Sequence, residues 1–142
     1  MKSLIAIFSV CVIVAVSACS QKVDEEKVPK KIKTSFAKDF PGASASWVKE
    51  DGKYEANFKI GNEEKSANYN LDGTMAENEV EIQTTELPAY VQTYISDHYK
   101  DKKIKSAAKI TNADGSINYE AEVDGKALLF DAEGHFLKIA EE

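Results

Sequence analysis

The amino-acid sequence predicts an α+β fold in which two tandem repeats, each a helix followed by antiparallel strands, form one sheet of about eight strands with both helices on one face. Three observations lead to this expectation: a short apolar N-terminal segment that precedes the folded part, one helical pattern that occurs twice, and strand-like alternation after each copy. The 142 residues are enough for one domain or for two very small halves that share a core.

The charged residues bear on the kind of partner. The formal net charge is −6, and every basic residue is a lysine. Arginine is the usual donor for bidentate contacts to phosphate and guanine. The absence of arginine, together with the negative charge, argues against a nucleic-acid partner.

The first residues have the features of an export signal. After the positive start Met1-Lys2, residues 4–16 are apolar except for one serine, which is typical of a signal-peptide core and too short to span a bilayer comfortably. The stretch Val16-Ser17-Ala18-Cys19 resembles the lipobox of bacterial lipoproteins, in which the cysteine is lipidated and becomes the first residue of the mature chain. We therefore expect a signal peptide over 1–18 and a lipid on Cys19; an ordinary secretory signal with an incidental cysteine is the alternative.

Lipidation of Cys19 would anchor the chain and remove its thiol chemistry. Cys11 lies in the segment that would be removed, so no free thiol would remain as a nucleophile or a metal ligand. Several acyl chains give a stable membrane anchor. Residues 19–27 are expected to be the lipidated cysteine and a polar tether. By resemblance to bacterial lipoproteins, the serine after Cys19 implies the outer membrane, on its periplasmic or its surface side.

One helical pattern is present twice, 59 residues apart. In the first copy, "VPKKIKTSFAKDF" at 28–40, apolar residues recur every four positions and a proline suits the first turn of a helix. In the second copy, "LPAYVQTYISDHY" at 87–99, the same positions are apolar and the proline is in the same place. Pro41-Gly42 ends the first helix.

Each helical pattern is followed by alternating apolar and polar residues. The alternation is clear over 53–60 and again over 118–123, which indicates two half-buried strands. The turns Asp51-Gly52 and Asp114-Gly115 precede these strands and predict hairpins.

A helix and two hairpins are thus read twice, in repeats 28–82 and 87–142 of a single domain over 28–142. The order "LPxxVxxYIxxxY … GSINYEAEVDGKALLFDAEGHFLKI" is similar to the PepSY-like family, which is related in fold to β-lactamase inhibitor protein. The resemblance covers nearly the whole of this domain. It implies exported, often lipid-anchored proteins and, for the inhibitor relatives, a sheet face that binds another protein. The chain lacks the disulfide-forming cysteines of the inhibitor, so inhibition of a β-lactamase in particular is not implied.

No catalytic constellation is recognisable in the sequence, and we expect no enzyme activity, no cofactor and no metal site. His98 and His135 do not have the spacing of metal ligands, and no nucleophile motif or phosphate-binding loop occurs. The alternating acidic residues at 77–81 and 120–124 match the exposed face of an antiparallel sheet. A Ca²⁺ or small-ligand site built from such carboxylates is the alternative.

The expected function is therefore that of a non-catalytic envelope protein that binds or inhibits another protein. A mixed, charged sheet face binds a charged partner by complementarity, and an exposed tryptophan would be a good anchor. The residues predicted to contact an envelope or secreted partner are Trp47, Glu55, Asn57, Lys59, Lys105, Glu120 and Glu122. Tyr90 and Tyr94, at the edge of the second helix, are further exposed candidates.

Overall fold

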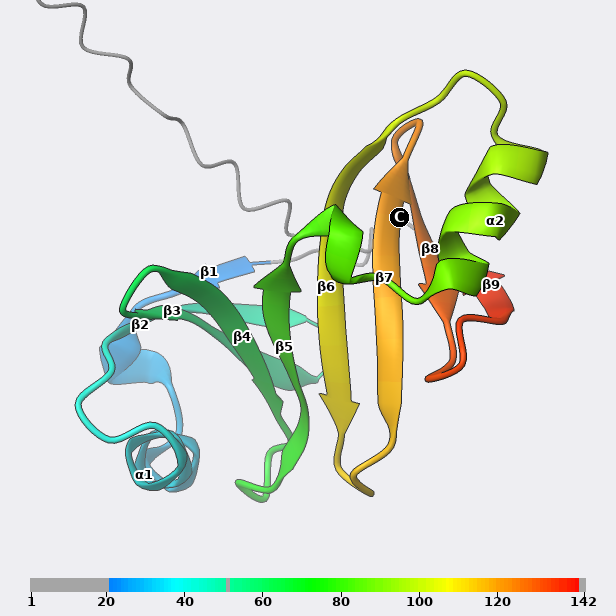
Figure 1. The fold of residues 1–142 in the computed structure, drawn as a ribbon. Coiled ribbons are helices and arrows are strands. Elements are labelled where there is room, and N and C mark those ends of the chain that lie inside the picture. Colours follow the sequence, from blue (N-terminus) through cyan, green and yellow to red (C-terminus); the bar gives the residue numbers. More distant parts are fainter. Residues whose placement is uncertain (1–20, 51, 141–142) are drawn as a thin grey trace, which may run out of the picture.

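The computed structural model describes residues 21–50 and 52–140, which form one antiparallel sheet of nine strands with two α-helices (Figure 1). The strands are hydrogen-bonded in their order along the chain, from β1 to β9. The first part contains β1 (Gln21–Val23), the 3₁₀ helix η1 (Glu25–Lys27), α1 (Lys30–Asp39), β2 (Ala45–Glu50), β3 (Lys53–Ile60), β4 (Glu63–Tyr69) and β5 (Met75–Ile82). The second part contains the 3₁₀ helix η2 (Thr84–Glu86), α2 (Ala89–His98), β6 (Ile104–Asn112), β7 (Ile117–Val123), β8 (Lys126–Phe130) and β9 (Phe136–Ile139).

The α+β class and the single antiparallel sheet are confirmed, with one correction at the N-terminal end. Residues 21–23, expected to belong to a tether, instead form the edge strand β1, which pairs with β2. This strand makes the sheet one strand wider than predicted. The predicted signal peptide and Cys19 lie outside the described residues. In the described part of the chain, no helix has the length and apolarity needed to cross a membrane.

The two helices form where the repeated pattern predicted them. Pro29 and Pro88 occupy the N-cap positions of α1 and α2, where a missing backbone N–H costs nothing. Each helix is ten residues long and buries two residues that are four positions apart. The buried pairs are Ile32 with Phe36, and Val91 with Ile95.

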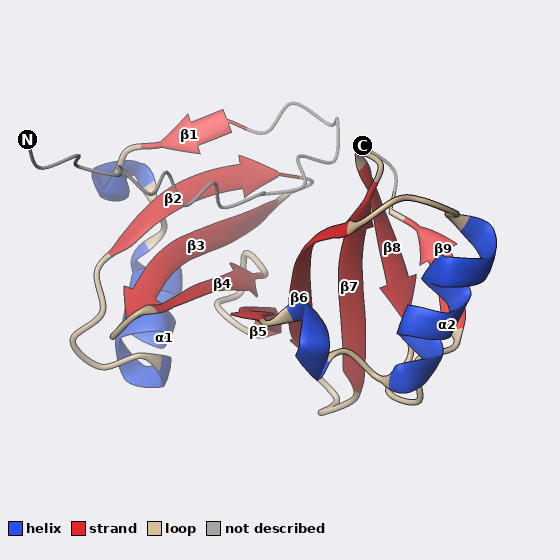
Figure 2. Ribbon diagram, turned by 45° about the horizontal axis from the view of Figure 1, so that its top comes forward, coloured by secondary structure: helices blue, strands red, loops and turns tan. Residues whose placement is uncertain are grey.

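The strand register places both helices on the same face of the sheet. Trp47, Ala56 and Ala67 stand directly opposite one another on β2, β3 and β4 and belong to the core beneath α1. Ala107, Ala121 and Leu128 form the corresponding row on β6, β7 and β8 in the core beneath α2. Directly paired residues share a face in an antiparallel ladder. Because β5 pairs with β4 on one side and with β6 on the other, its register shows that the two rows lie on the same face of the sheet. The opposite face is called the helix-free face below (Figure 2).

Trp47 is in the core and is not the exposed anchor that the sequence analysis considered. Its side chain is 4% exposed, and its ring centroid lies 5.4 Å from that of Phe36 in an edge-on arrangement. Phe36 also contacts Phe58, at 5.0 Å between ring centroids. The physical reason is strand parity: Trp47 pairs with Ala56, whose side of the sheet is covered by α1.

Two glycines allow hairpin turns to pack closely against the helices. Gly73, in the β4–β5 turn, has φ +90°, and a Cβ there would lie 3.3 Å from Ser35 Oγ of α1. Gly134, in the β8–β9 turn, has φ +91°, and a Cβ there would lie 3.0 Å from the Cβ of Pro88. Both positions combine a left-handed backbone with a close approach, which only glycine accommodates without strain.

Candidate functional site

Six of the seven predicted partner-binding side chains lie on the helix-free face. The register puts Glu55 and Asn57 of β3 on the side opposite to the buried Tyr54, Ala56 and Phe58. Strand register and side-chain contacts place the other predicted residues, except Trp47, on the same side of the sheet. The residues of this face are Glu55, Asn57, Lys59, Lys105, Glu120 and Glu122.

Ion pairs within the chain occupy both ends of the helix-free face. At one end, the ammonium group of Lys59 contacts the carboxylate of Glu64. At the other end, Lys105 Nζ lies 2.9 Å from Glu122 Oε1, and Ser106 Oγ donates to Glu122 Oε2 at 3.1 Å. A register shift between Ile104 and Ser106 allows Lys105 and Ser106 to flank the same carboxylate.

Glu122 therefore does not present a free charge to a partner. Its exposed fraction is 6%, although strand alternation predicts it at the exposed surface. The sequence predicted correctly which face of β7 carries Glu122. It did not predict the bulge in β6 that places two hydrogen-bond donors beside this carboxylate. Glu122 stabilises the local structure, and Lys105 is held beside it.

The middle of the helix-free face is a group of carboxylates from three strands. Glu55 lies on β3 and Glu120 on β7, and β5 between them carries three glutamates at alternate positions, Glu77, Glu79 and Glu81. In the part of the chain that the structure describes, no lysine is found within ion-pair distance of these five side chains. The three β5 residues were read from the sequence as an ordinary solvated strand face, although their spacing of two was a visible signal.

Burial and mutual repulsion shift the protonation of these carboxylates. Burial, followed by the charges of Glu120, Glu55 and other neighbours, raises the pKa of Glu79 to about 8. Burial and the charge of Glu122 raise the pKa of Glu120 to about 7. The pKa of Glu55 is also raised, mainly by burial. The face therefore changes its charge between mildly acidic and mildly basic pH.

Amide and hydroxyl groups complete the surroundings of the carboxylates. Asn68 Nδ2 donates to Glu77 Oε1 at 3.0 Å. Asn57, Ser66 and Glu79 are directly opposite one another on β3, β4 and β5. Ser66 is thus a hydroxyl beside a carboxylate of raised pKa, but catalysis would also need a group that binds the reacting oxygen. The arrangement is suited to holding protons and to attracting cationic groups.

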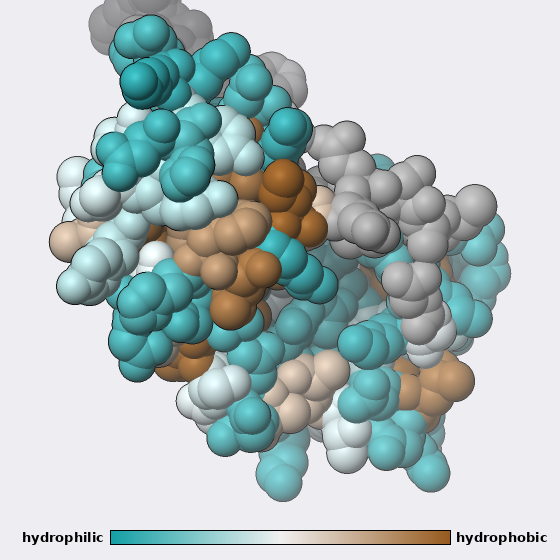
Figure 3. All heavy atoms as spheres, turned by 90° about the vertical axis from the view of Figure 1, so that its right-hand side faces the viewer, coloured by the Kyte–Doolittle hydropathy of each residue, from teal (hydrophilic) through white to brown (hydrophobic). Residues whose placement is uncertain are grey.

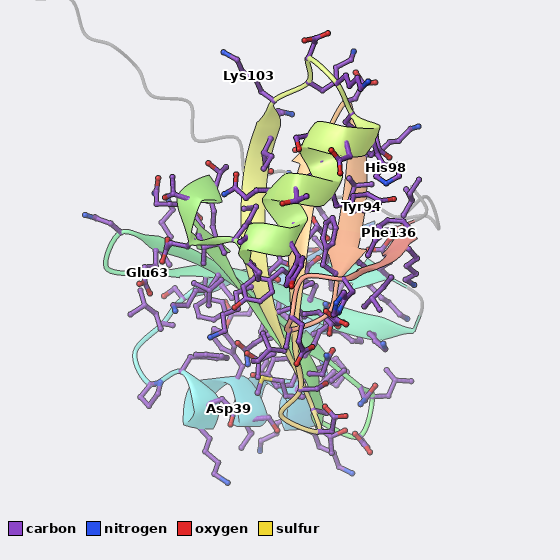
Figure 4. The ribbon with its side chains drawn as sticks, turned by 45° about the vertical axis from the view of Figure 1, so that its right-hand side comes forward. Asp39, Glu63, Tyr94, His98, Lys103 and Phe136 are labelled. Atoms are coloured by element: carbon purple, nitrogen blue, oxygen red, sulfur yellow. The ribbon has the colours of Figure 1, made fainter. Side chains whose placement is uncertain are left out.

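Both histidines lie on the α2 side of the molecule. Tyr94 is between His98 and Phe136, with ring centroids 4.2 Å and 4.8 Å away (Figure 4). His135 stacks on the exposed ring of Tyr90 at 5.6 Å between centroids. Figure 3, seen from this side, shows apolar surface among hydrophilic surface, and the exposed large apolar residues of β9 are Leu137 and Ile139.

The β8–β9 turn brings together three potential metal ligands that no spacing motif in the sequence had indicated. One ligand atom each of Asp131, Glu133 and His135 lies within 4.8 Å of the others. Asp131 Oδ1 already accepts the backbone N–H groups of Glu133 and His135, at 3.1 Å and 2.8 Å. Asp131 Oδ2 lies 3.1 Å from His135 Nδ1. The conformation of the turn accounts for these contacts, as it does for side-chain oxygens in Asx turns generally.

Several solved structures have a similar fold. A protein from Bacteroides eggerthii described as one of the "putative periplasmic proteins" matches with a TM-score of 0.70 and 16% identity, over 78% of this chain and 86% of that chain. A DUF2874 family protein from Bacteroides ovatus matches with a TM-score of 0.67 and 20% identity, over 78% and 85%. A BLIP-like protein from Bacteroides fragilis matches with a TM-score of 0.62 and 20% identity, over 78% and 84%. No curated protein matches the sequence.

These features define a class of α+β proteins in which two helices cover one face of a single antiparallel sheet and a group of carboxylates lies on the other. A family described as "Putative beta-lactamase-inhibitor-like, PepSY-like" matches residues 14–65 and 52–138. The chain belongs to this PepSY-like family, as the resemblance of its sequence had indicated.

Proposed function

We propose that this protein is a non-catalytic, lipid-anchored envelope protein that binds another protein through its helix-free face. One observation carries the proposal: the carboxylates in the middle of this face have no lysine of the described chain as a partner, whereas lysines are paired at both ends. Like charges that are held together in a half-buried setting raise the free energy of the unbound protein, and a cationic partner would relieve this repulsion. The partner is expected to present a lysine- or arginine-bearing surface.

The setting in the cell envelope rests on Cys19 and on the relatives. The residues before Cys19 resemble a lipobox, and a structural neighbour is described as periplasmic. The outer membrane, on its periplasmic or surface side, is the proposed location. Intact mass analysis of the membrane-extracted protein tests the anchor: a mature chain that begins at Cys19 and carries acyl chains supports it, and a Cys19→Ser variant should be released from the membrane fraction.

Site-specific photo-crosslinking in intact cells tests the binding face. A photoreactive residue is placed at Glu81, which is exposed on the helix-free face, and as a matched control at Asp97, which is exposed on α2. The proposal expects a protein adduct from position 81 and not from position 97. Equal adducts from both positions, or none from position 81, would contradict it.

A charge-reversal pair then tests the chemistry with the identified partner. Glu55→Lys with Glu81→Lys should weaken binding at least tenfold, because two charges of the face are inverted. Glu26→Lys with Asp97→Lys makes the same change of net charge at exposed positions away from this face and should leave affinity within about twofold. Comparable effects of the two variants would indicate non-specific attraction.

Binding of Ca²⁺ or a small ligand is the second candidate, because clustered carboxylates are the ligands that Ca²⁺ prefers. In the described residues, however, no three ligand groups of the helix-free face come within 4.8 Å of one another. A calorimetric titration with millimolar Ca²⁺ distinguishes the candidates. A saturable heat that Glu79→Gln abolishes would favour the ion site over the protein partner.

We also propose that residues 28–82 and 87–142 are two copies of one structural unit. Each copy contains an α-helix followed by four strands and is preceded by a 3₁₀ helix, and both α-helices follow a proline. Because β5 and β6 pair across the boundary and each part has a small core, the fragment 28–82 should not unfold cooperatively by itself. A sharp transition of this fragment near that of the whole protein would contradict this interpretation.

A further inference from the structure

The position of β1 leaves almost no spacer between the folded protein and the proposed lipid anchor. Gln21 pairs with Lys49, and Val23 pairs with Trp47 and packs against the first core. The segment that the sequence suggested as a tether is therefore part of the sheet. Only Ser20 separates Cys19 from the first residue of the edge strand.

We propose that the corner of the sheet formed by the start of β1 and the β2–β3 turn rests directly on the phospholipid bilayer. The inference depends on the proposed lipidation of Cys19. Two Cα–Cα steps from Cys19 to Gln21 span at most about 8 Å. The headgroup region of one leaflet is about 5–8 Å thick, as the difference between the full bilayer and its hydrocarbon core implies. Acyl chains on Cys19 therefore hold Gln21 at the level of the headgroups.

The direction of the strands brings the β2–β3 turn to the same level. Gln21 is opposite Lys49, and Lys49 is opposite Tyr54, so three strands are aligned at this corner. Glu50 and Lys53 are the next pair beyond this row, on the side from which the chain enters β1. Glu50 and Lys53 thus lie past Gln21, toward the anchored end.

The side chains of the corner are compatible with a phospholipid surface. Lys22, Lys49 and Lys53 are all exposed, and Lys49 Nζ lies 5.6 Å from the centroid of the Tyr54 ring. These three lysines outnumber the two acidic residues at this corner of the sheet in the sequence, Glu50 and Asp51. In the chain as a whole, acidic residues predominate. Exposed lysines close to anionic headgroups are attracted to the membrane surface.

The opposite rim of the same strands points away from the membrane in this orientation. β3 runs from Lys53 to Ile60, and Ile60 pairs with Glu63 at the start of β4. A strand of this length measures about 25 Å. Lys53 and Glu63 are therefore two exposed positions on adjacent strands that differ mainly in their height above the bilayer.

Fluorescence quenching in vesicles tests the orientation. The lipidated full-length mature protein, with a single added cysteine at Lys53 or at Glu63, is labelled with one fluorophore. It is reconstituted in phosphatidylethanolamine and phosphatidylglycerol vesicles, 3:1, that contain a headgroup-attached quencher. The label at Lys53→Cys should be quenched at least twice as strongly as the label at Glu63→Cys. A twelve-residue Gly/Ser insertion after Ser20 should remove the difference while the protein stays bound.

Each outcome decides the inference. Stronger quenching at Lys53→Cys that disappears with the insertion supports the direct contact. Equal quenching at both positions without the insertion shows that β1 detaches or that the protein tumbles on its anchor, and this overturns the inference while the anchor stands. A mature chain without lipid on Cys19 overturns the anchor together with the inference. Crosslinking through Glu81 reports on the partner separately from these results.

Discussion

Replacing Glu79 by glutamine should stabilise the protein at neutral and mildly basic pH. The folded-state pKa of Glu79 is about 8, against 4.5 for an unperturbed glutamate, because the group is half-buried and surrounded by other carboxylates on the helix-free face. A raised carboxylate pKa means that the folded state binds the proton more tightly than the unfolded state. The contribution of Glu79 is therefore most favourable below pH 4.5 and is lost as the pH rises toward 8. Glutamine resembles the protonated form and does not ionise.

The pKa shift determines the size of the effect. The difference between 4.5 and about 8 corresponds to about 5 kcal/mol when the carboxylate is fully ionised. Part of the shift comes from Glu120 and Glu55, whose protons rearrange when Glu79 ionises, and the group is only half-buried. We therefore expect Glu79→Gln to raise the free energy of unfolding by about 1–3 kcal/mol at pH 8 and by less than about 1 kcal/mol at pH 5.

Urea unfolding at pH 5 and pH 8, monitored by the fluorescence of Trp47, measures both values. The wild-type protein should be less stable at pH 8 than at pH 5, and the variant should show a smaller difference. Glu122→Gln is the matched control on the same face, because it removes the charged partner of Lys105 and should destabilise the protein by about 1–3 kcal/mol at pH 5. The loss should be smaller at pH 8, where the variant also removes the charge that raises the pKa of Glu120. Wild-type stability that increases from pH 5 to pH 8, or a Glu79→Gln variant that is less stable at pH 8, would refute the reasoning.

Three further changes test the core and the turns by the same urea measurement. Gly134→Ala should lower the free energy of unfolding by about 2–3 kcal/mol, because the new methyl group is strained by the positive φ and also comes too close to α2. Gly125→Ala should lower it by only about 1 kcal/mol, because Gly125 has φ +75° but no atoms near its Cβ position. Equal losses in the two variants would show that the contact with α2 is unimportant. Replacement of Trp47 by alanine should destabilise the protein by about 3–5 kcal/mol, and no loss would place the side chain outside the core. Tyr69→Phe removes the hydrogen bond from the Tyr69 hydroxyl to Asp39, at 3.1 Å, and should cost about 0.5–1.5 kcal/mol; an unchanged midpoint would show that water replaces this bond.

The helix-free face illustrates which parts of a site can be read from a sequence. Alternation over 53–60 was sufficient to place Glu55 and Asn57 on the side away from the core, because side chains of a strand point to opposite faces in turn. The same alternation was visible at Glu77, Glu79 and Glu81. What alternation does not contain is the distance between strands. The proximity of Glu120, whose charge helps to raise the pKa of Glu79, depends on the pairing of β5, β6 and β7.

Some interpretations changed because local patterns do not report tertiary pairing. "SASWVKE" was compatible with either parity, and only the register of β2 against β3 places Trp47 beneath α1. Likewise, the polar residues before the first helix looked like a tether, since the sequence does not show that Gln21–Val23 finds hydrogen-bond partners on β2. Glu122 was assigned to the correct face, but the bulge at Lys105 that buries it is a feature of strand pairing.

The sequence by itself determined the fold class and the order of the elements that follow β1, because helical and strand periodicities, prolines and turn glycines act over a few neighbouring residues. It also determined the absence of arginine and the resemblance to a lipobox before Cys19. Only the tertiary structure decided which charges are paired, which carboxylates repel one another and how close the sheet begins to the proposed anchor. These properties depend on distances between residues that are remote in the chain, and in an antiparallel sheet such distances are determined by register.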